Sequence, residues 1–63
     1  MNIGDKIIWR YVDKKTWKRG EVLTLFPNQL VELTVTEDFG LIPTNNKMIV
    51  KLTEIEYIIY EPR

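Results

Sequence analysis

The sequence predicts an all-β domain in which five meandering strands curl into a small closed barrel, with one 3₁₀ turn before the last strand. Three observations predict this fold class. Apolar and polar side chains alternate along several short runs, as in strands with one buried face. Ile, Val and Thr dominate, and they suit a pleated surface better than a helix, whereas alanine is absent. Short turn-forming segments separate the runs.

The expected strands span about residues 4–12, 17–26, 29–37, 47–52 and 56–60. In the first, Ile7, Trp9 and Tyr11 occupy alternate positions and should share the inner face. Trp9 is assigned to the core because both of its same-face neighbours point inward. The polar segment 13–16 forms the turn to the second strand.

The second and third strands meet at Pro27 and Asn28, where Pro suits a turn and Asn tolerates a positive φ. Alternation in the third and fourth strands points these side chains inward: Val31, Leu33, Val35, Met48, Val50 and Leu52. A longer loop, residues 39–46, joins the two strands.

The end of the chain carries a different spacing. Leu52, Ile55 and Ile58 recur every three residues, which is the spacing of a single 3₁₀ turn. A last short strand follows it. Closure of the strands into a barrel would remove the exposed edges of so small a sheet.

The sequence places more apolar side chains on the outer face of the strands than a lone barrel needs. Under this pleat the outward positions hold Ile8, Val12, Leu23 or Leu25, Ile49, and one of Ile58 and Ile59. A bulge in the second strand would turn some of them inward. Scattered exposed apolar residues are ordinary, whereas a contiguous patch would form an interface with another copy or with a partner. Both interpretations stay open.

The composition excludes several kinds of chemistry. The 63 residues form one domain, residues 1–63, and contain no cysteine or histidine, hence no disulfide, no thiolate or imidazole metal site and no Ser/Cys–His pair. Glu37 and Asp38 are adjacent and do not converge on one substrate. The three glycines are dispersed and form no phosphate-binding loop. We expect no enzymatic activity, no catalytic residue, no cofactor and no metal.

The sequence shows neither a membrane-spanning segment nor a secretory signal. Its apolar runs are too short to span a bilayer. Residues 1–5 show neither a basic nor an apolar region of a secretory signal. We therefore expect a cytoplasmic protein.

Charge is distributed unevenly although the net charge is zero. Residues 1–20 carry six basic and two acidic side chains, and residues 21–63 carry three basic and seven acidic ones. Such polarity can orient an encounter with a charged partner. The alternative is a solvated surface of mixed charge.

Two candidate binding surfaces follow from these patterns. The first is the tip of the opening hairpin, with Arg10, Lys14, Lys15, Trp17, Lys18 and Arg19. Basic groups with an interleaved aromatic suit a nucleic-acid backbone and a stacked base, whereas a pI near 6.2 is low for such a domain. Trp17 could instead cap the open end of the barrel.

The second candidate surface is a groove between the first and third loops. It would be lined by Tyr11, Trp17 and Phe39, aromatic residues of the kind that anchor protein interfaces. Tyr11 could equally belong to the core.

The segments 4–11 and 16–22 resemble the opening hairpin of Tudor-like and other SH3-like barrels: a Gly-Asp step, an alternating strand, a polar turn and an aromatic. The segment 50–58 is similar to the 3₁₀ turn and closing strand of the same superfold. The resemblance implies a five-stranded SH3-like barrel. Tudor-type domains bind methylated Lys or Arg in an aromatic cage; by this resemblance Tyr11 takes the first cage position, while Lys18 stands at the next.

We expect a small non-enzymatic protein-interaction module that docks a partner protein through the hairpin and the groove and is able to self-associate. By analogy with stand-alone barrels of this kind, an accessory or inhibitor factor of a phage or mobile element would fit. The first alternative is a nucleic-acid-binding barrel that uses the basic hairpin from Arg10 to Arg19. The second is an oligomeric ring whose pore holds a small ligand.

Overall fold

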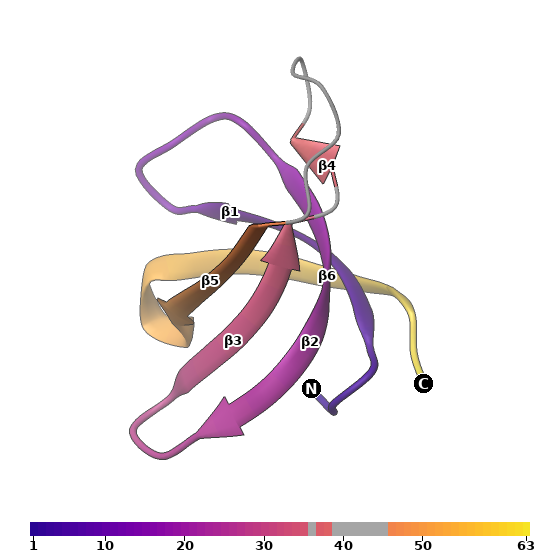
Figure 1. The fold of residues 1–63 in the computed structure, drawn as a ribbon. Helices are drawn as coiled ribbons and strands as arrows, with labels where there is room; N and C mark the ends of the chain where they lie inside the picture. Colours follow the sequence, from indigo (N-terminus) through magenta and orange to yellow (C-terminus); the bar gives the residue numbers. More distant parts are fainter. Residues whose placement is uncertain (36, 39–45) are drawn as a thin grey trace.

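A computed structural model describes residues 1–35, 37–38 and 46–63 (Figure 1). The elements are β1 (Lys6–Tyr11), β2 (Lys18–Phe26), β3 (Leu30–Val35), β4 (Glu37–Asp38), β5 (Asn46–Lys51), the 3₁₀ turn η1 (Leu52–Glu54) and β6 (Ile55–Glu61). The prediction of an all-β fold with one 3₁₀ turn directly before the last strand is confirmed. Within the described residues, no helix is both long and apolar enough to cross a bilayer.

The strands follow the order β5-β3-β2-β1-β6, with every pair antiparallel, and β4 pairs separately with β2. Figure 1 shows the layer of β2, β3 and β5 in front of β1 and β6. The long curved β2 pairs with β3 in the front layer and with β1 in the other, and so connects the two layers. In the part of the chain that the structure describes, β5 and β6 form no ladder with each other. The expected complete closure is therefore not seen, and the sheet keeps two outer edges.

The core lies between these layers, and among the described residues Asp5 is the one buried charged side chain. Its buried hydrophobic members are Ile7, Trp9, Val22, Val31, Leu33, Val35, Val50 and Ile55. Tyr11, Met48 and Leu52 pack against this cluster while partly exposed. The predicted inward alternation is thus confirmed, and Trp9, with none of its surface exposed, lies in the core as expected.

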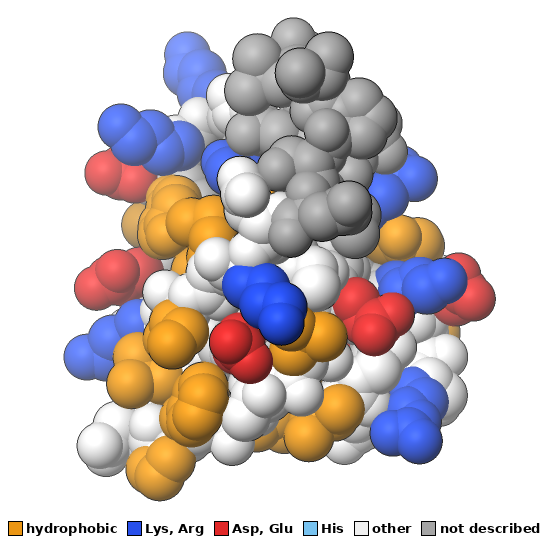
Figure 2. All heavy atoms as spheres, viewed as in Figure 1, with side chains coloured by type: hydrophobic (Ala, Val, Ile, Leu, Met, Phe, Trp, Pro, Cys, Tyr) orange, Lys and Arg blue, Asp and Glu red, His pale blue; other side chains and the backbone are white. Residues whose placement is uncertain are grey.

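The second strand contains a bulge, the arrangement that the sequence analysis left open. The β2–β3 register shifts between Val22 and Thr24, so that Leu25 lies opposite the buried Val31. Leu25 nevertheless stays 43% exposed beside the turn, together with Phe26 and Leu30. Figure 2 shows hydrophobic side chains gathered at this end of the molecule, toward the lower left of the view.

Strand boundaries differ from the sequence prediction by two residues at two places and by at most one residue elsewhere. The third strand was expected to run to residue 37, but β3 ends at Val35 and β4 pairs with Lys18 and Arg19 of β2 instead. The alternation of apolar and polar residues indicates that residues 29–37 are extended, but it does not say which strand they pair with. The change of partner after Val35 therefore has no local signal in the sequence. The first strand begins at Lys6 rather than residue 4, because Gly4 adopts a positive φ of 95° in a turn.

Asp5 ties the two ends of the described chain together. Its side chain is buried, and its two carboxylate oxygens accept hydrogen bonds from the backbone N–H of Arg63 (2.9 Å) and of Asn2 (2.8 Å). These two bonds, that from Arg63 first, hold the pKa of Asp5 below its ordinary value of 3.8.

Replacement of this carboxylate is expected to change the acid stability of the fold. A lowered folded-state pKa means that the charged form stabilises the fold fully above pH 3.8 and that this stability is lost as the pH falls through the lowered pKa. Asp5→Asn should therefore lower Tm at neutral pH, and the difference in Tm between the variant and the wild type should become smaller as the pH falls below 3.8. Thermal melts followed by circular dichroism across this range measure the difference. Asp13→Asn, at an exposed turn position, controls for the loss of one charge; a deficit independent of pH would contradict the assignment.

Candidate functional site

Arg10 connects three segments on the outward face of β1. The β1–β6 ladder places it opposite Glu56, whose Oε2 lies 2.7 Å from Nη2 and accepts a hydrogen bond from Nε at 2.9 Å. The guanidinium carbon lies 4.9 Å from the centroid of the ring of Trp17, the residue directly before β2. A longer bond of 3.3 Å from Nη1 reaches the carbonyl oxygen of Lys14 in the connecting loop. We call Trp17, Arg10 and Glu56 the Arg10 row.

The Arg10 row orders exposed side chains more than it stabilises the fold. The Arg10 and Glu56 side chains are 28% and 50% exposed, so their ion pair contributes about 0–1 kcal/mol. A cation–π contact at such a site adds about 0.5–1 kcal/mol. Both contacts hold Arg10 against the half-buried Trp17 in one arrangement. The row is therefore a preordered surface whose aromatic and guanidinium groups remain within reach of another molecule.

Tyr11 and Lys18 lie on the other side of the sheet, around the buried Trp9. The Tyr11 ring meets the Trp9 ring edge-on, at 5.4 Å between centroids, and the Lys18 ammonium lies 5.5 Å from the Trp9 centroid. Tyr11 is thus packed against the core while partly exposed. Trp17, which contacts Arg10, lies on the opposite face.

The predicted groove depends on a residue that the structure does not describe. Among the described residues, the rings of Tyr11 and Trp17 are not brought into contact. Phe39, its third expected member, lies outside the described residues. The groove therefore stays a prediction, whereas Arg10 and Trp17 of the predicted hairpin tip do meet.

Lys14 and Lys15 are exposed in the loop that joins β1 and β2. The loop begins with a turn in which the Lys14 N–H donates to the Tyr11 carbonyl oxygen at 3.0 Å. Together with the bond from Arg10, this turn holds the loop against the Arg10 row. Lys14 and Lys15 therefore lie next to the Arg10 row, and we call Lys14, Lys15 and the Arg10 row the hairpin face.

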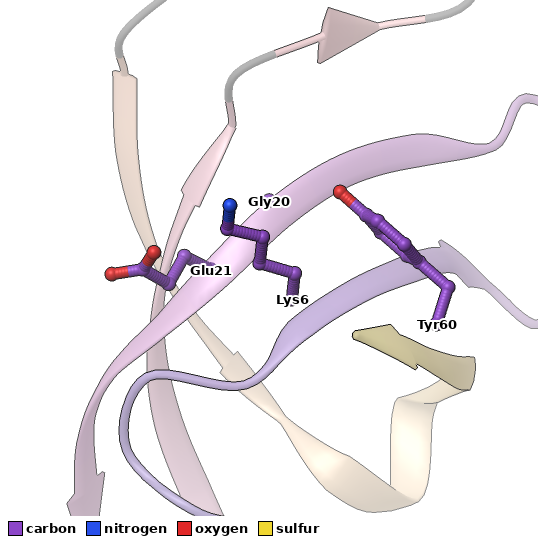
Figure 3. Close-up of a pocket in the computed structure, with 4 residues that line it drawn as sticks. All are labelled: Lys6, Gly20, Glu21 and Tyr60. Carbon is purple, nitrogen blue, oxygen red and sulfur yellow. The ribbon is translucent and has the colours of Figure 1, made fainter. Parts of the chain in front are cut away.

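Arg19 belongs to a separate cluster farther along β2. Its guanidinium carbon lies 5.1 Å from the centroid of the Tyr60 ring in β6. Beside it, a pocket of about 310 Å³ is lined by Lys6, Gly20, Glu21 and Tyr60. Figure 3 shows Lys6 and Tyr60 projecting over β2 near Gly20, with the Glu21 carboxylate directed away from Tyr60.

Sequence reasoning missed this pocket. Tyr60 is the extra residue where the β1–β6 register shifts between Lys6 and Ile7. Such a bulge depends on pairing between strands at opposite ends of the chain, and the sequence offers no local signal for it.

Acidic residues from the second half of the chain lie beside the basic first half. Ion pairs join Arg10 to Glu56 and Lys6 to Glu61. Folding therefore brings together some of the charges that the sequence separates. Lys14 and Lys15 remain the exposed basic residues of the loop tip.

Within the described residues, no three acidic side chains come together in a way that could hold a metal ion. Comparison of the chain with family models, with curated proteins and with solved structures gives no match.

Proposed function

We propose that this chain is a small SH3-like protein-interaction module without enzymatic activity, and that it binds a partner protein through the hairpin face. The observation that carries the proposal is the guanidinium of Arg10, stacked 4.9 Å from Trp17 and ion-paired to Glu56. Trp and Arg are the residues most enriched among those that dominate protein-binding energies. Because these side chains are already ordered, binding loses less conformational entropy.

The SH3-like part of the proposal is supported by topology. Strands in the order β6-β1-β2-β3-β5, with η1 between β5 and β6, agree with the arrangement that the sequence resemblance implies. The role as an accessory or inhibitor of phage or mobile-element kind stays a prediction from the sequence, as does the cytoplasmic location.

A protein partner is favoured over nucleic acid by the charges beside the hairpin. A phosphate backbone binds where cations release its counterions. Arg10 already pairs with Glu56, and the cationic groups of Lys18 and Arg19 lie over the rings of Trp9 and Tyr60. The basic charge that remains exposed at the tip suits an acidic rim on a protein partner.

Trp17→Ala is expected to weaken partner binding at least tenfold while Tm stays within a few degrees, because Trp17 is only half-buried. The wild-type chain first captures its partner from a lysate of its host, and the purified partner is then titrated calorimetrically against each variant. Phe26→Ala is the matched control, since Phe26 is a 40% exposed aromatic at the other end of β2.

The control separates the hairpin face from the apolar end of the β2–β3 hairpin. Phe26→Ala should bind like the wild type. Equal affinity of Trp17→Ala and the wild type would contradict the proposal, as would a loss confined to Phe26→Ala. Recovery of nucleic acid alone, with affinity that falls steeply as salt rises, would support the alternative function.

A further inference from the structure

The two outer strands of the sheet differ in how well they are protected from pairing. Within the described residues β5 pairs only with β3, and β6 only with β1, so each has one unpaired edge. Exposed edges pair readily with further strands unless Lys, Pro or a bulge prevents it. β5 carries Lys47 and Lys51, whereas β6 (Ile55–Glu61) contains neither Lys nor Pro. The bulge of β6 lies at Tyr60, near the end of the strand, so the edge from Ile55 to Ile59 is open to a further strand.

The two most exposed large hydrophobic side chains in the described part of the chain lie on these two edge strands. Ile49 of β5 is 58% exposed and Ile58 of β6 is 60% exposed. In the ladders, Ile49 pairs with Glu32 and Ile58 pairs with the outward-facing Ile8, so both edge residues point away from the core. Each edge thus presents one uncovered isoleucine at its centre.

The neighbours of these isoleucines are complementary in charge. Ile49 is flanked, two residues away on each side, by Lys47 and Lys51. Ile58 is flanked in the same way by Glu56 and Tyr60. Residues two apart share a face of a strand, so one edge offers a basic-apolar-basic row and the other an acidic-apolar-aromatic row.

We propose that the β5 edge of one copy of this chain pairs antiparallel with the β6 edge of a second copy. The register puts Ile49 opposite Ile58, Lys51 opposite Glu56, and Lys47 opposite Tyr60. These pairs are an apolar contact, an ion pair and a cation–π contact, each favourable across a ladder. Arg10 contacts Oε2 of Glu56, and Oε1 would receive Lys51 of the neighbouring copy.

Pairing between identical edges is less favourable. Two β5 edges centred on Ile49 would place Lys47 opposite Lys51 twice, and like charges directly opposite one another destabilise a ladder. Two β6 edges centred on Ile58 would place Glu56 opposite Tyr60 and gain no ion pair. Only pairing of the β5 edge with the β6 edge gives a favourable contact at all three positions of the register.

The proposed contact is head-to-tail, so every added copy brings another free edge. Such contacts close into rings when the rotation between copies permits, and otherwise grow into open chains. A ring would leave no copy with an uncovered edge. The self-association does not depend on the partner protein proposed above.

Single-edge variants test the contact directly. Sedimentation equilibrium of the full wild-type chain should give a mass that rises with concentration above 7.5 kDa and beyond that of a dimer. Ile49→Lys and Ile58→Lys should each weaken self-association at least tenfold. An equimolar mixture of the two should form a heterodimer and grow no further, because it contains only one intact pair of edges. Val12→Lys, at a site 55% exposed in the loop, is the control and should assemble like the wild type.

Each departure from this pattern overturns the proposal. A wild type that is monomeric at every concentration would do so, as would self-association of either single-edge variant. Failure of the mixture to dimerise would contradict the unlike pairing, and dissociation by Val12→Lys would indicate non-specific apolar contact. Circular dichroism of each variant establishes that the monomeric forms are folded.

The register has its own test, since the chain contains no cysteine. Under oxidised glutathione, Lys51→Cys mixed with Glu56→Cys should form a disulfide-linked heterodimer, and each variant alone should not. Preferential crosslinking of Lys47→Cys with Glu56→Cys would indicate parallel pairing and overturn the antiparallel register.

Discussion

Gly20→Ala is expected to destabilise the chain by about 3 kcal/mol or more, because the added methyl group would meet strand backbone. A Cβ at Gly20 would overlap the carbonyl oxygen of Thr34. Both groups belong to strand backbones, so neither can move aside as a flexible side chain would. The close approach is part of the fold, since the neighbouring Glu21 N–H donates to Thr34 Oγ1 at 2.9 Å where β2 leaves the β3 ladder.

Urea denaturation of Gly20→Ala measures this effect. A chain of this length has a total stability of roughly 3–9 kcal/mol at ordinary values per residue, so the variant should lose a third or more of its free energy of unfolding. Gly4→Ala is the comparison, because its Cβ would meet the flexible Arg63 side chain at 2.7 Å and its cost is chiefly that of a positive φ, about 1–2 kcal/mol. A Gly20→Ala variant as stable as Gly4→Ala would show that the β2–β3 crossing is looser than described.

Trp9→Ala is expected to destabilise the chain by about 3–5 kcal/mol through the cavity that it leaves. Trp9 is completely buried and packs against Tyr11 on one side, with the Lys18 ammonium over its ring. In so small a core, one indole is a large share of the buried apolar surface. Chemical denaturation and the loss of near-ultraviolet circular dichroism both report the outcome.

Trp9→Phe is the conservative companion of this variant. It keeps an aromatic ring beside Tyr11 and should lose clearly less stability than Trp9→Ala. Equal loss in the two variants would contradict the cavity explanation, because, among the described residues, the buried Trp9 indole N–H has no hydrogen-bond partner whose loss could account for it.

The strands could be predicted because one face of each is buried against a single core. The alternation of Ile7 with Trp9, and of Val31 with Leu33, reports that burial directly. The 3₁₀ turn was equally visible, since its apolar spacing of three differs from that of the strands on either side. These features are local, and local patterns are recorded in the sequence.

Features that depend on contacts between distant segments could not be predicted in the same way. The pairing of β4 with β2, and the bulge that brings Tyr60 beside Lys6, depend on how the two layers curve. Closure was expected from the cost of open edges in a single chain. In the described residues β5 and β6 are not paired with each other, so both edges stay open. In the self-association that we propose, a second copy covers them.

The candidate site was predicted in part. Residue types and charge drew attention to Arg10 and Trp17, and the structure brings them together. Glu56, which fixes Arg10 from the far end of the chain, gave no signal because an isolated glutamate on a strand is usually a solvated residue. The sequence also suggested an excess of positive charge at the hairpin, whereas in the fold Glu56 pairs with Arg10 of that hairpin.

The binding role of the hairpin face is tested most directly by the two tryptophan indole N–H signals in a ¹H–¹⁵N spectrum of the chain. Trp17 lies in the hairpin face and Trp9 lies in the core, so the two signals are internal references for each other. On addition of the captured partner, the Trp17 signal and the backbone amides of residues 10–17 should shift or broaden first, while the Trp9 signal changes little. Shifts confined to β3 and β5, with the Trp17 signal unmoved at saturation, would contradict the account.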